Sequence, residues 1–158
     1  MRLPAPRRAA AAALVAVLAA FAPMAGAAPD EVDPDLAARD ADYAAGKRAI
    51  DAKDWAEAVR RFERAKVRHP DQADVHNLLG FSHRNLRQYE PAFAAYRRAI
   101  EIDPRHRGAH EYIGETYLAI GDLAGAQKHL DALRAICVLP CEELADLEKA
   151  VAQYQAKR

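Results

Sequence analysis

ADVHNLLGFSHRNLRQYEPAFAAYRRAIEIDP, residues 73–104, contains two short amphipathic segments joined by a tight turn and closed by a proline. Small or apolar residues occupy five spaced positions, Leu79, Gly80, Ala92, Tyr96 and Ala99. The same frame fits 34 residues earlier and 34 residues later, at Gly46, Ala58, Phe62, Ala65 and Pro70 and at Gly114, Ala126, Leu130, Leu133 and Pro140. Self-similarity at this period is typical of stacked helical hairpins.

The pattern resembles the tetratricopeptide repeat (TPR) family. The resemblance implies an all-α fold, a right-handed α-solenoid of three hairpins at residues 39–72, 73–106 and 107–140, within the span 34–140. We expect seven helices, at residues 34–52, 55–68, 72–86, 89–102, 106–120, 122–136 and 142–156. The last helix belongs to residues 141–158 and is expected to cover the open end of the stack, because one of its faces is apolar.

Three glycines, Gly46, Gly80 and Gly114, recur at one position of each first helix. A glycine inside a helix costs about 1 kcal/mol relative to alanine, so its repetition needs a structural reason. We expect the paired second helix to approach closely at this point through Ala58, Ala92 and Ala126.

The first 33 residues predict export. Residues 1–8 are basic, residues 9–22 form an apolar run, and Ala25-Gly26-Ala27 supplies small residues before a cleavage point. We therefore expect a signal peptide at residues 1–27, a linker at residues 28–33, and a periplasmic or secreted protein without a membrane span after cleavage. A membrane anchor is the alternative, but the run of about 14 residues is short of the ~20 that span a bilayer.

Charge argues against nucleic acid as a partner. The chain has 23 basic and 23 acidic residues, and removal of the leader with Arg2, Arg7 and Arg8 leaves three more acidic than basic residues. A nucleic-acid binder would carry a basic patch or stripe.

No motif predicts an enzyme, a resident metal or a cofactor. Ser/His/Asp sets, phosphate-binding loops and zinc-protease motifs are absent from the sequence. His76 and His110 share one repeat position with Asp42, yet equivalent positions on stacked repeats lie about 10 Å apart. A packing role for the two histidines is therefore favoured over metal binding.

In proteins that this chain resembles, first helices line a concave groove that holds a partner segment. The repeat frame then gives candidate groove residues Tyr43, Lys47, Asn77, Phe81, Arg84, Asn85, Glu111 and Glu115. Asparagine can bond a peptide backbone through both donor and acceptor atoms, and the aromatic rings offer apolar contact. One branch of the family clamps a terminal carboxylate with Lys and Asn, but here Gly108, Glu111 and Tyr112 stand where its third-repeat basic residues are needed.

The two cysteines, Cys137 and Cys141, flank the junction between the third repeat and the last helix. An even, small number of cysteines in an exported chain favours a disulfide. The alternative is a thiol- or metal-handling pair, since Cys141 near a helix N-terminus would have a lowered pKa. Two functions follow: an interaction scaffold, acting as adaptor or assembly factor for an unidentified protein or peptide, or a thiol or metal accessory factor. Self-association is a third reading.

Overall fold

The computed structural model describes residues 35–157, so the predicted signal peptide and linker lie outside the described residues. The helices are α1 (Leu36–Arg39), α2 (Ala41–Asp51), α3 (Trp55–Arg68), α4 (Ala73–Asn85), α5 (Tyr89–Ile102), α6 (Arg107–Ala119), α7 (Leu123–Ile136) and α8 (Glu142–Ala156). No strand occurs between residues 35 and 157. The predicted all-α class is confirmed, and from α3 onward each helix bound lies within one residue of its prediction.

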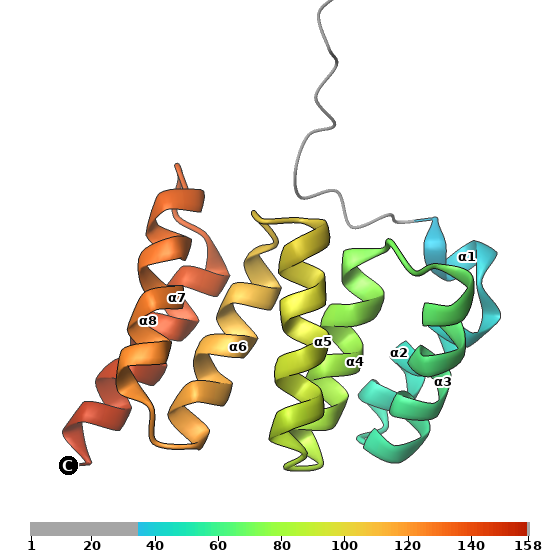
Figure 1. The fold of residues 1–158 in the computed structure, drawn as a ribbon, viewed down its shortest axis with the longest axis horizontal. Coiled ribbons are helices and arrows are strands. Elements are labelled where there is room, and N and C mark those ends of the chain that lie inside the picture. Colours follow the sequence, from blue (N-terminus) through green and yellow to red (C-terminus); the bar gives the residue numbers. More distant parts are fainter. Residues whose placement is uncertain (1–34, 158) are drawn as a thin grey trace, which may run out of the picture.

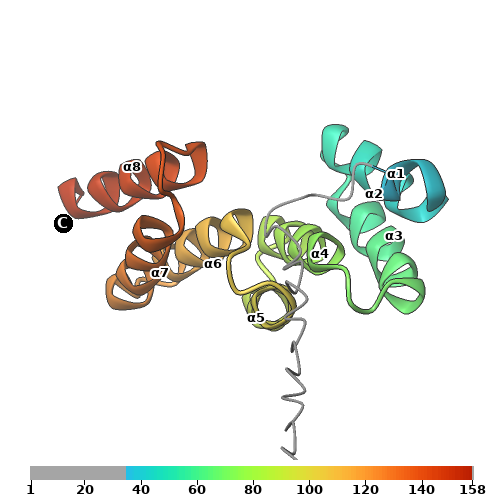
Figure 2. The ribbon, with the colours of Figure 1, turned by 90° about the horizontal axis from the view of Figure 1, so that it is seen from above.

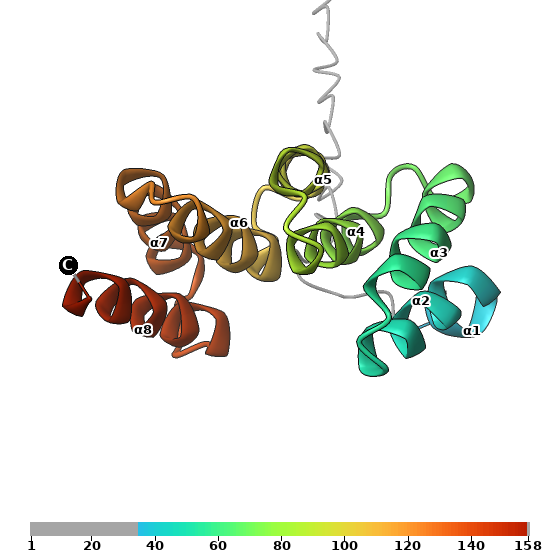
Figure 3. The ribbon, with the colours of Figure 1, turned by 90° about the horizontal axis from the view of Figure 1, so that it is seen from below.

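Consecutive helices pair into hairpins, and the hairpins stack side by side (Figure 1). Seen from above and from below, the stack is curved: α3, α5 and α7 lie on its outer side, and α2, α4 and α6 on its inner side (Figures 2 and 3). Helix α8 packs against α6 and α7 and borders the inner side at one end. We call the side formed by α2, α4, α6 and α8 the inner face.

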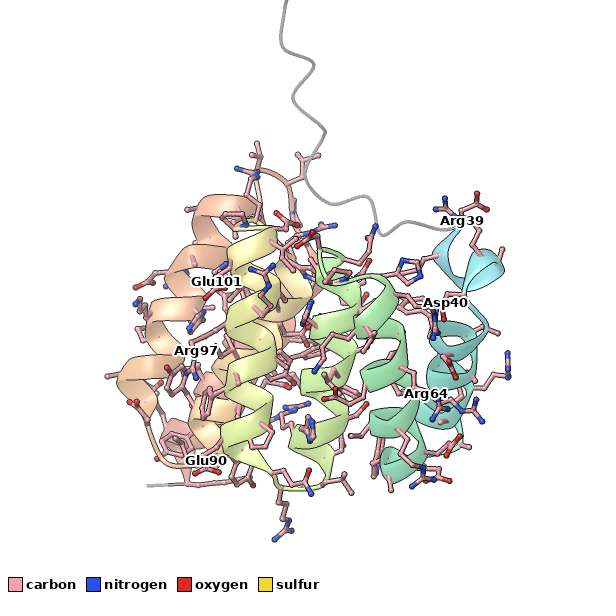
Figure 4. All side chains as sticks on the ribbon, turned by 45° about the vertical axis from the view of Figure 1, so that its right-hand side comes forward. Arg39, Asp40, Arg64, Glu90, Arg97 and Glu101 are labelled. Atoms are coloured by element: carbon pink, nitrogen blue, oxygen red, sulfur yellow. A yellow bond between two sulfur atoms is a disulfide. The ribbon has the colours of Figure 1, made fainter. Side chains whose placement is uncertain are left out.

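The first predicted helix, residues 34–52, is wrong in one respect, because it is broken at Asp40. Asp40 has extended backbone (φ −120°, ψ 109°) and its carboxylate accepts a 2.8 Å hydrogen bond from the Tyr43 amide, which caps α2. The same buried carboxylate accepts hydrogen bonds from Arg68 Nε (2.7 Å) and His69 Nε2 (2.9 Å). These contacts, chiefly the one to Arg68, hold the Asp40 pKa well below its usual range. Figure 4 labels Asp40 where α1 meets α2.

The repeated glycines do allow close approach, but ring and leucine side chains fill the space rather than alanines. A Cβ at Gly46 would come within 2.7 Å of Phe62, and one at Gly80 within 2.6 Å of Tyr96. Both rings are fully buried, so they have little room to move. Helices α2 and α4 therefore each lie directly on an aromatic ring of their own hairpin partner.

Helix α8 takes the corresponding place for the third repeat. A Cβ at Gly114 would come within 2.7 Å of Leu147, which is fully buried among Ala126, Leu130 and Leu133. Cys137 and Cys141 join α7 to α8 with their sulfur atoms 2.05 Å apart. Among residues 35–157 no helix combines the length and apolar character needed to cross a bilayer.

Each hairpin turn places one residue in the left-handed region of backbone space. These residues are Lys53 (φ 56°), Arg87 (φ 59°) and Gly121 (φ 85°), again spaced by 34 positions. Only the third is a glycine, the residue that adopts this conformation without steric cost.

Candidate functional site on the inner face

Four side chains bridge α4 and α6. The Phe81 and Tyr112 rings lie 4.9 Å apart between centroids, and the Arg84 guanidinium is 5.4 Å from the first centroid and 5.6 Å from the second. Arg84 also donates to the carboxylate of Glu115. Helix α5 lies on the outer side of α4 and α6 (Figures 2 and 3), and these four side chains are half-buried. We call Phe81, Arg84, Tyr112 and Glu115 the bridging cluster.

The bridging cluster combines apolar contact with charge. A guanidinium over aromatic faces is held by cation–π attraction, and its ion pair with Glu115 fixes its orientation. Trp55 at the start of α3 extends the aromatic surface, with its ring 5.8 Å from that of Phe81. The sequence-based prediction included Phe81, Arg84 and Glu115 but missed Tyr112 and Trp55. In the sequence, Tyr112 stands out only as a departure from the carboxylate clamp, and Trp55 lies outside the first helices from which groove residues are predicted.

Glu111 lies one turn before Glu115 on α6 and is only 9% exposed. Among the described residues it has no hydrogen bond or ion pair. Burial, and then the carboxylates of Glu115, Asp146 and Glu143, raise the pKa of Glu111 to about 8. Glu111 is therefore largely neutral at pH 7, unlike Asp40, whose buried carboxylate is satisfied by Arg68.

The remaining predicted groove residues differ in their exposure to solvent. Tyr43 is 2% exposed and packs edge-on against Phe62, 5.8 Å between centroids. It belongs to the core, so its prediction as a groove contact is wrong. Lys47 and Asn85 are exposed, and Asn85 Nδ2 donates to the Phe81 carbonyl at 2.8 Å.

Asn77 is only 5% exposed, so it is not an open contact residue. Its amide lies against the start of α6, where a Cβ on Gly108 would be 3.2 Å from Nδ2. Its Oδ1 is buried without a hydrogen-bond partner between residues 35 and 157. Asn77 therefore sits beneath the inner face.

The repeated histidines have a structural partner in each copy. His76 Nε2 lies 2.8 Å from the Pro70 carbonyl, and His110 Nε2 lies 3.1 Å from the Pro104 carbonyl. Asp42, at the same repeat position, instead forms ion pairs with Arg61, Arg64 and Arg68. In the described part of the chain no three His, Cys, Asp or Glu side chains are arranged to hold a metal ion.

A separate pocket of about 320 Å³ opens on the outer side, between α3 and α5 and over α4. Its lining mixes the apolar Leu79 and Ala95 with His76, Lys66 and Arg98. It does not include any of the residues predicted for partner binding, and it lies away from the bridging cluster.

The curved stack and its aromatic, charged inner face define a helical-repeat protein. Residues 73–106 match the family model described as tetratricopeptide repeat. This match confirms the predicted resemblance to the tetratricopeptide-repeat family for the central repeat. A comparison with curated proteins finds no match to the sequence.

Solved TPR structures share this fold. The TPR2B domain of yeast Sti1, in its pHsp70 complex, is 22% identical with a TM-score of 0.70, covering 78% of this chain and 98% of that one. PcrH in complex with the chaperone binding region of PopD is 24% identical with a TM-score of 0.65, covering 75% and 90%. The first TPR of Spaghetti (RPAP3), bound to the HSP90 peptide SRMEEVD, is 16% identical with a TM-score of 0.64, covering 73% and 91%.

Proposed function

We propose that the chain is an exported protein-interaction module that binds an extended segment of a partner protein along its inner face. The observation that carries this proposal is the bridging cluster, which presents two aromatic rings and a fixed guanidinium on the side of the stack open to a ligand. Aromatic residues and arginine are the types that dominate binding energy at interfaces. The similar structures of yeast Sti1, PcrH and Spaghetti were each solved with a protein or peptide partner.

The binding face is tested by photo-cross-linking in whole cells. A photoreactive amino acid at Asn85, which is exposed beside Phe81, should form one dominant adduct with a partner. The matched position is Arg97, which is exposed on α5 on the outer side (Figure 4). Adducts of equal yield at both positions, or no adduct at Asn85, would exclude the inner face as the partner-binding surface.

The contribution of the bridging cluster is tested by a pair of arginine substitutions. Arg84→Ala should reduce the Asn85 adduct at least fivefold, because it removes the cation held over both rings. Arg97→Ala should leave the adduct unchanged. Circular dichroism of both variants checks that folding is retained.

We further propose that the chain acts in the bacterial periplasm as an adaptor or assembly factor, after removal of residues 1–27. The sequence of residues 1–28 supports export. The intact mass of the protein from a periplasmic fraction should correspond to a start at Ala28 or Pro29. Recovery of the uncleaved chain in the cytoplasmic fraction would contradict this location.

The chemical state of the two cysteines distinguishes the interaction-module proposal from a thiol- or metal-handling role. We propose a structural disulfide between Cys137 and Cys141, supported by its position between α7 and α8. Thiol titration of the native exported protein should find no free thiol, and elemental analysis no stoichiometric metal. A reactive thiol pair or a bound metal would favour the accessory-factor role.

A further inference from the structure

Four carboxyl groups gather where α6 meets α8. The two helices touch at Gly114 and Leu147 and run in the same direction (Figure 1). Glu111 and Glu115 flank Gly114 on α6, and Glu143 and Asp146 precede Leu147 on α8. The contact between the helices thus brings the four side chains to the same part of the inner face.

Glu111 is the buried member of this group, at 9% exposed, and its carboxyl group has no hydrogen bond or ion pair with any residue from 35 to 157. Leaving a carboxyl group in an apolar setting without a hydrogen bond is unfavourable, and buried carboxylates in proteins are normally paired. This chain meets that requirement at Asp40, which is 3% exposed and bonded to Arg68, His69 and the Tyr43 amide. No side chain in residues 35–157 meets it at Glu111, whose carboxylate oxygens keep contact with solvent on the inner face.

The nearby cations are too few and are directed elsewhere. Arg84 is paired with Glu115 and lies over the rings of Phe81 and Tyr112. Arg107 Nε lies 3.8 Å from Glu143. Four carboxyl groups therefore face two guanidinium groups, and neither guanidinium bonds to Glu111. Coulombic attraction at such a site favours an additional cation.

We infer that the α6–α8 junction is a socket for a lysine or arginine side chain of the partner segment, with Glu111 as its base. The residues next to that basic side chain lie on Phe81 and Tyr112, so the segment is basic and apolar rather than acidic. This inference rests on the proposed function and specifies its ligand. The socket would bind a cation, whereas a clamp for a terminal carboxylate binds an anion.

Binding of a cation at Glu111 requires the ionised carboxylate, so affinity should depend on pH. The charged groups facing Glu111 are Glu115 on its own helix, Glu143 and Asp146 on α8, and Arg84 on α4. Because the pKa of Glu111 is raised to about 8, a bound lysine displaces a proton below that pH. Affinity should rise between pH 6 and pH 9, and this rise should be absent in Glu111→Gln.

The test uses a phage-displayed library of random twelve-residue peptides, selected on the exported protein at pH 8. Clones are sorted by whether binding is lost in Asn85→Trp, an exposed position where added bulk obstructs the inner face. We expect inner-face clones to be enriched in lysine or arginine next to apolar residues. The strongest is synthesised with its basic residue intact or replaced by norleucine, and its Kd is measured by fluorescence anisotropy.

Glu111→Gln should weaken the basic peptide at least tenfold at pH 8, and norleucine replacement should do the same in the wild type. The matched control is Glu90→Gln, at an exposed position on α5 (Figure 4), which should leave the Kd unchanged. Inner-face clones without basic enrichment, or an unchanged Kd in Glu111→Gln, would refute the socket while leaving the proposed function intact. Failure to find any clone sensitive to Asn85→Trp would overturn both.

Discussion

At the residue scale, the hairpin turns show where the repeat tolerates local strain. Lys53, Arg87 and Gly121 occupy equivalent positions with positive φ. A side chain in this conformation crowds its own backbone, at a cost of roughly 1–2 kcal/mol. The first two turns are nevertheless formed, because packing of the flanking helices against Phe62 and Tyr96 fixes the chain on both sides.

Replacing the strained residues by glycine should therefore stabilise the protein. We expect Lys53→Gly and Arg87→Gly to raise the free energy of unfolding by about 0.5–1 kcal/mol each, after the greater chain entropy of glycine is subtracted. Urea denaturation measures the effect. Gly121→Ala is the reverse control and should destabilise; a loss of stability in both glycine variants would show that the turns are unstrained.

Glu111 should make stability depend on pH in the direction opposite to most carboxyl groups. Its pKa is raised from 4.5 to about 8 in the folded chain, so between these values the folded state holds a proton that the unfolded state has released. Stability therefore falls as pH rises through this window. The Tm of Glu111→Gln relative to wild type should be higher at pH 9 than at pH 5, as measured by calorimetry. An identical difference at both pH values would contradict the raised pKa.

Much of the fold follows from residues whose spacing is visible in the sequence. Pro70, Pro104 and the glycines locate the repeats, because each enforces one backbone or packing requirement. Exposure is harder to predict, since it depends on which neighbour covers a position. Tyr43 was predicted as a groove contact, yet it is buried against Phe62.

The candidate site was only partly predictable for the same reason. Phe81, Arg84 and Glu115 were found because they project from first helices at groove positions. The role of Tyr112 depends on Phe81 and Arg84 in the preceding repeat. The burial of Glu111 depends on α8, which lies outside the repeat frame.

At the scale of the element, Asp40 decides where the first repeat begins. The apolar periodicity continues from Leu36 to Ile50 and predicts one helix, whereas the structure ends α1 at Arg39 and starts α2 at Ala41. The break allows the Asp40 carboxylate to cap α2 and to bond Arg68 and His69 at the end of α3. Arg68 and His69 lie 28 and 29 residues from Asp40 in the sequence. The local sequence pattern alone therefore could not predict the helix break at Asp40.

Asp40→Ala should destabilise more than loss of an ordinary cap. Asp54 caps α3 at an exposed position through the Glu57 amide at 3.0 Å, and Asp54→Ala should cost about 1 kcal/mol. Asp40→Ala also removes the partner of Arg68, so we expect about 2–3 kcal/mol. Urea denaturation at pH 7 compares the two variants, and equal losses would contradict the network.

The same network should shape acid stability. The Asp40 pKa is lowered in the folded state, so its contribution is present above the unfolded value near 3.8 and is lost as pH falls further. The difference in the free energy of unfolding between wild type and Asp40→Ala, measured by urea denaturation, should therefore become smaller below pH 4.

At the scale of the whole molecule, each hairpin is stabilised by its contacts with the neighbouring units of the stack. Between successive units of the stack, the main contacts join α3 to α4, α5 to α6, and α6 to α8. Helix α8 covers Leu130 and Leu133 through Leu147 and Val151. In a repeat array of this kind, the terminal units carry the fewest supporting interfaces.

Removal of the disulfide should loosen that terminal unit first. Reduction, or Cys137→Ser with Cys141→Ser, should cost about 2 kcal/mol for a loop of this length. Hydrogen exchange should quicken in α8 and at Gly114, while α4 and α5 keep their protection. Uniform quickening across all helices would show instead that the stack opens as a single unit.

Helix α8 is held by the Cys137–Cys141 disulfide at its start and by packing of Leu147 and Val151 further along, and this arrangement has a consequence for the ligand socket. Glu143 and Asp146 are carried by α8, whereas Glu111 and Phe81 are carried by the hairpins. A change in thiol redox conditions that frees the end of α8 would therefore draw two of the four acidic side chains away from a bound segment. Affinity for the partner segment would fall, while the aromatic surface formed by Phe81 and Tyr112 would stay unchanged.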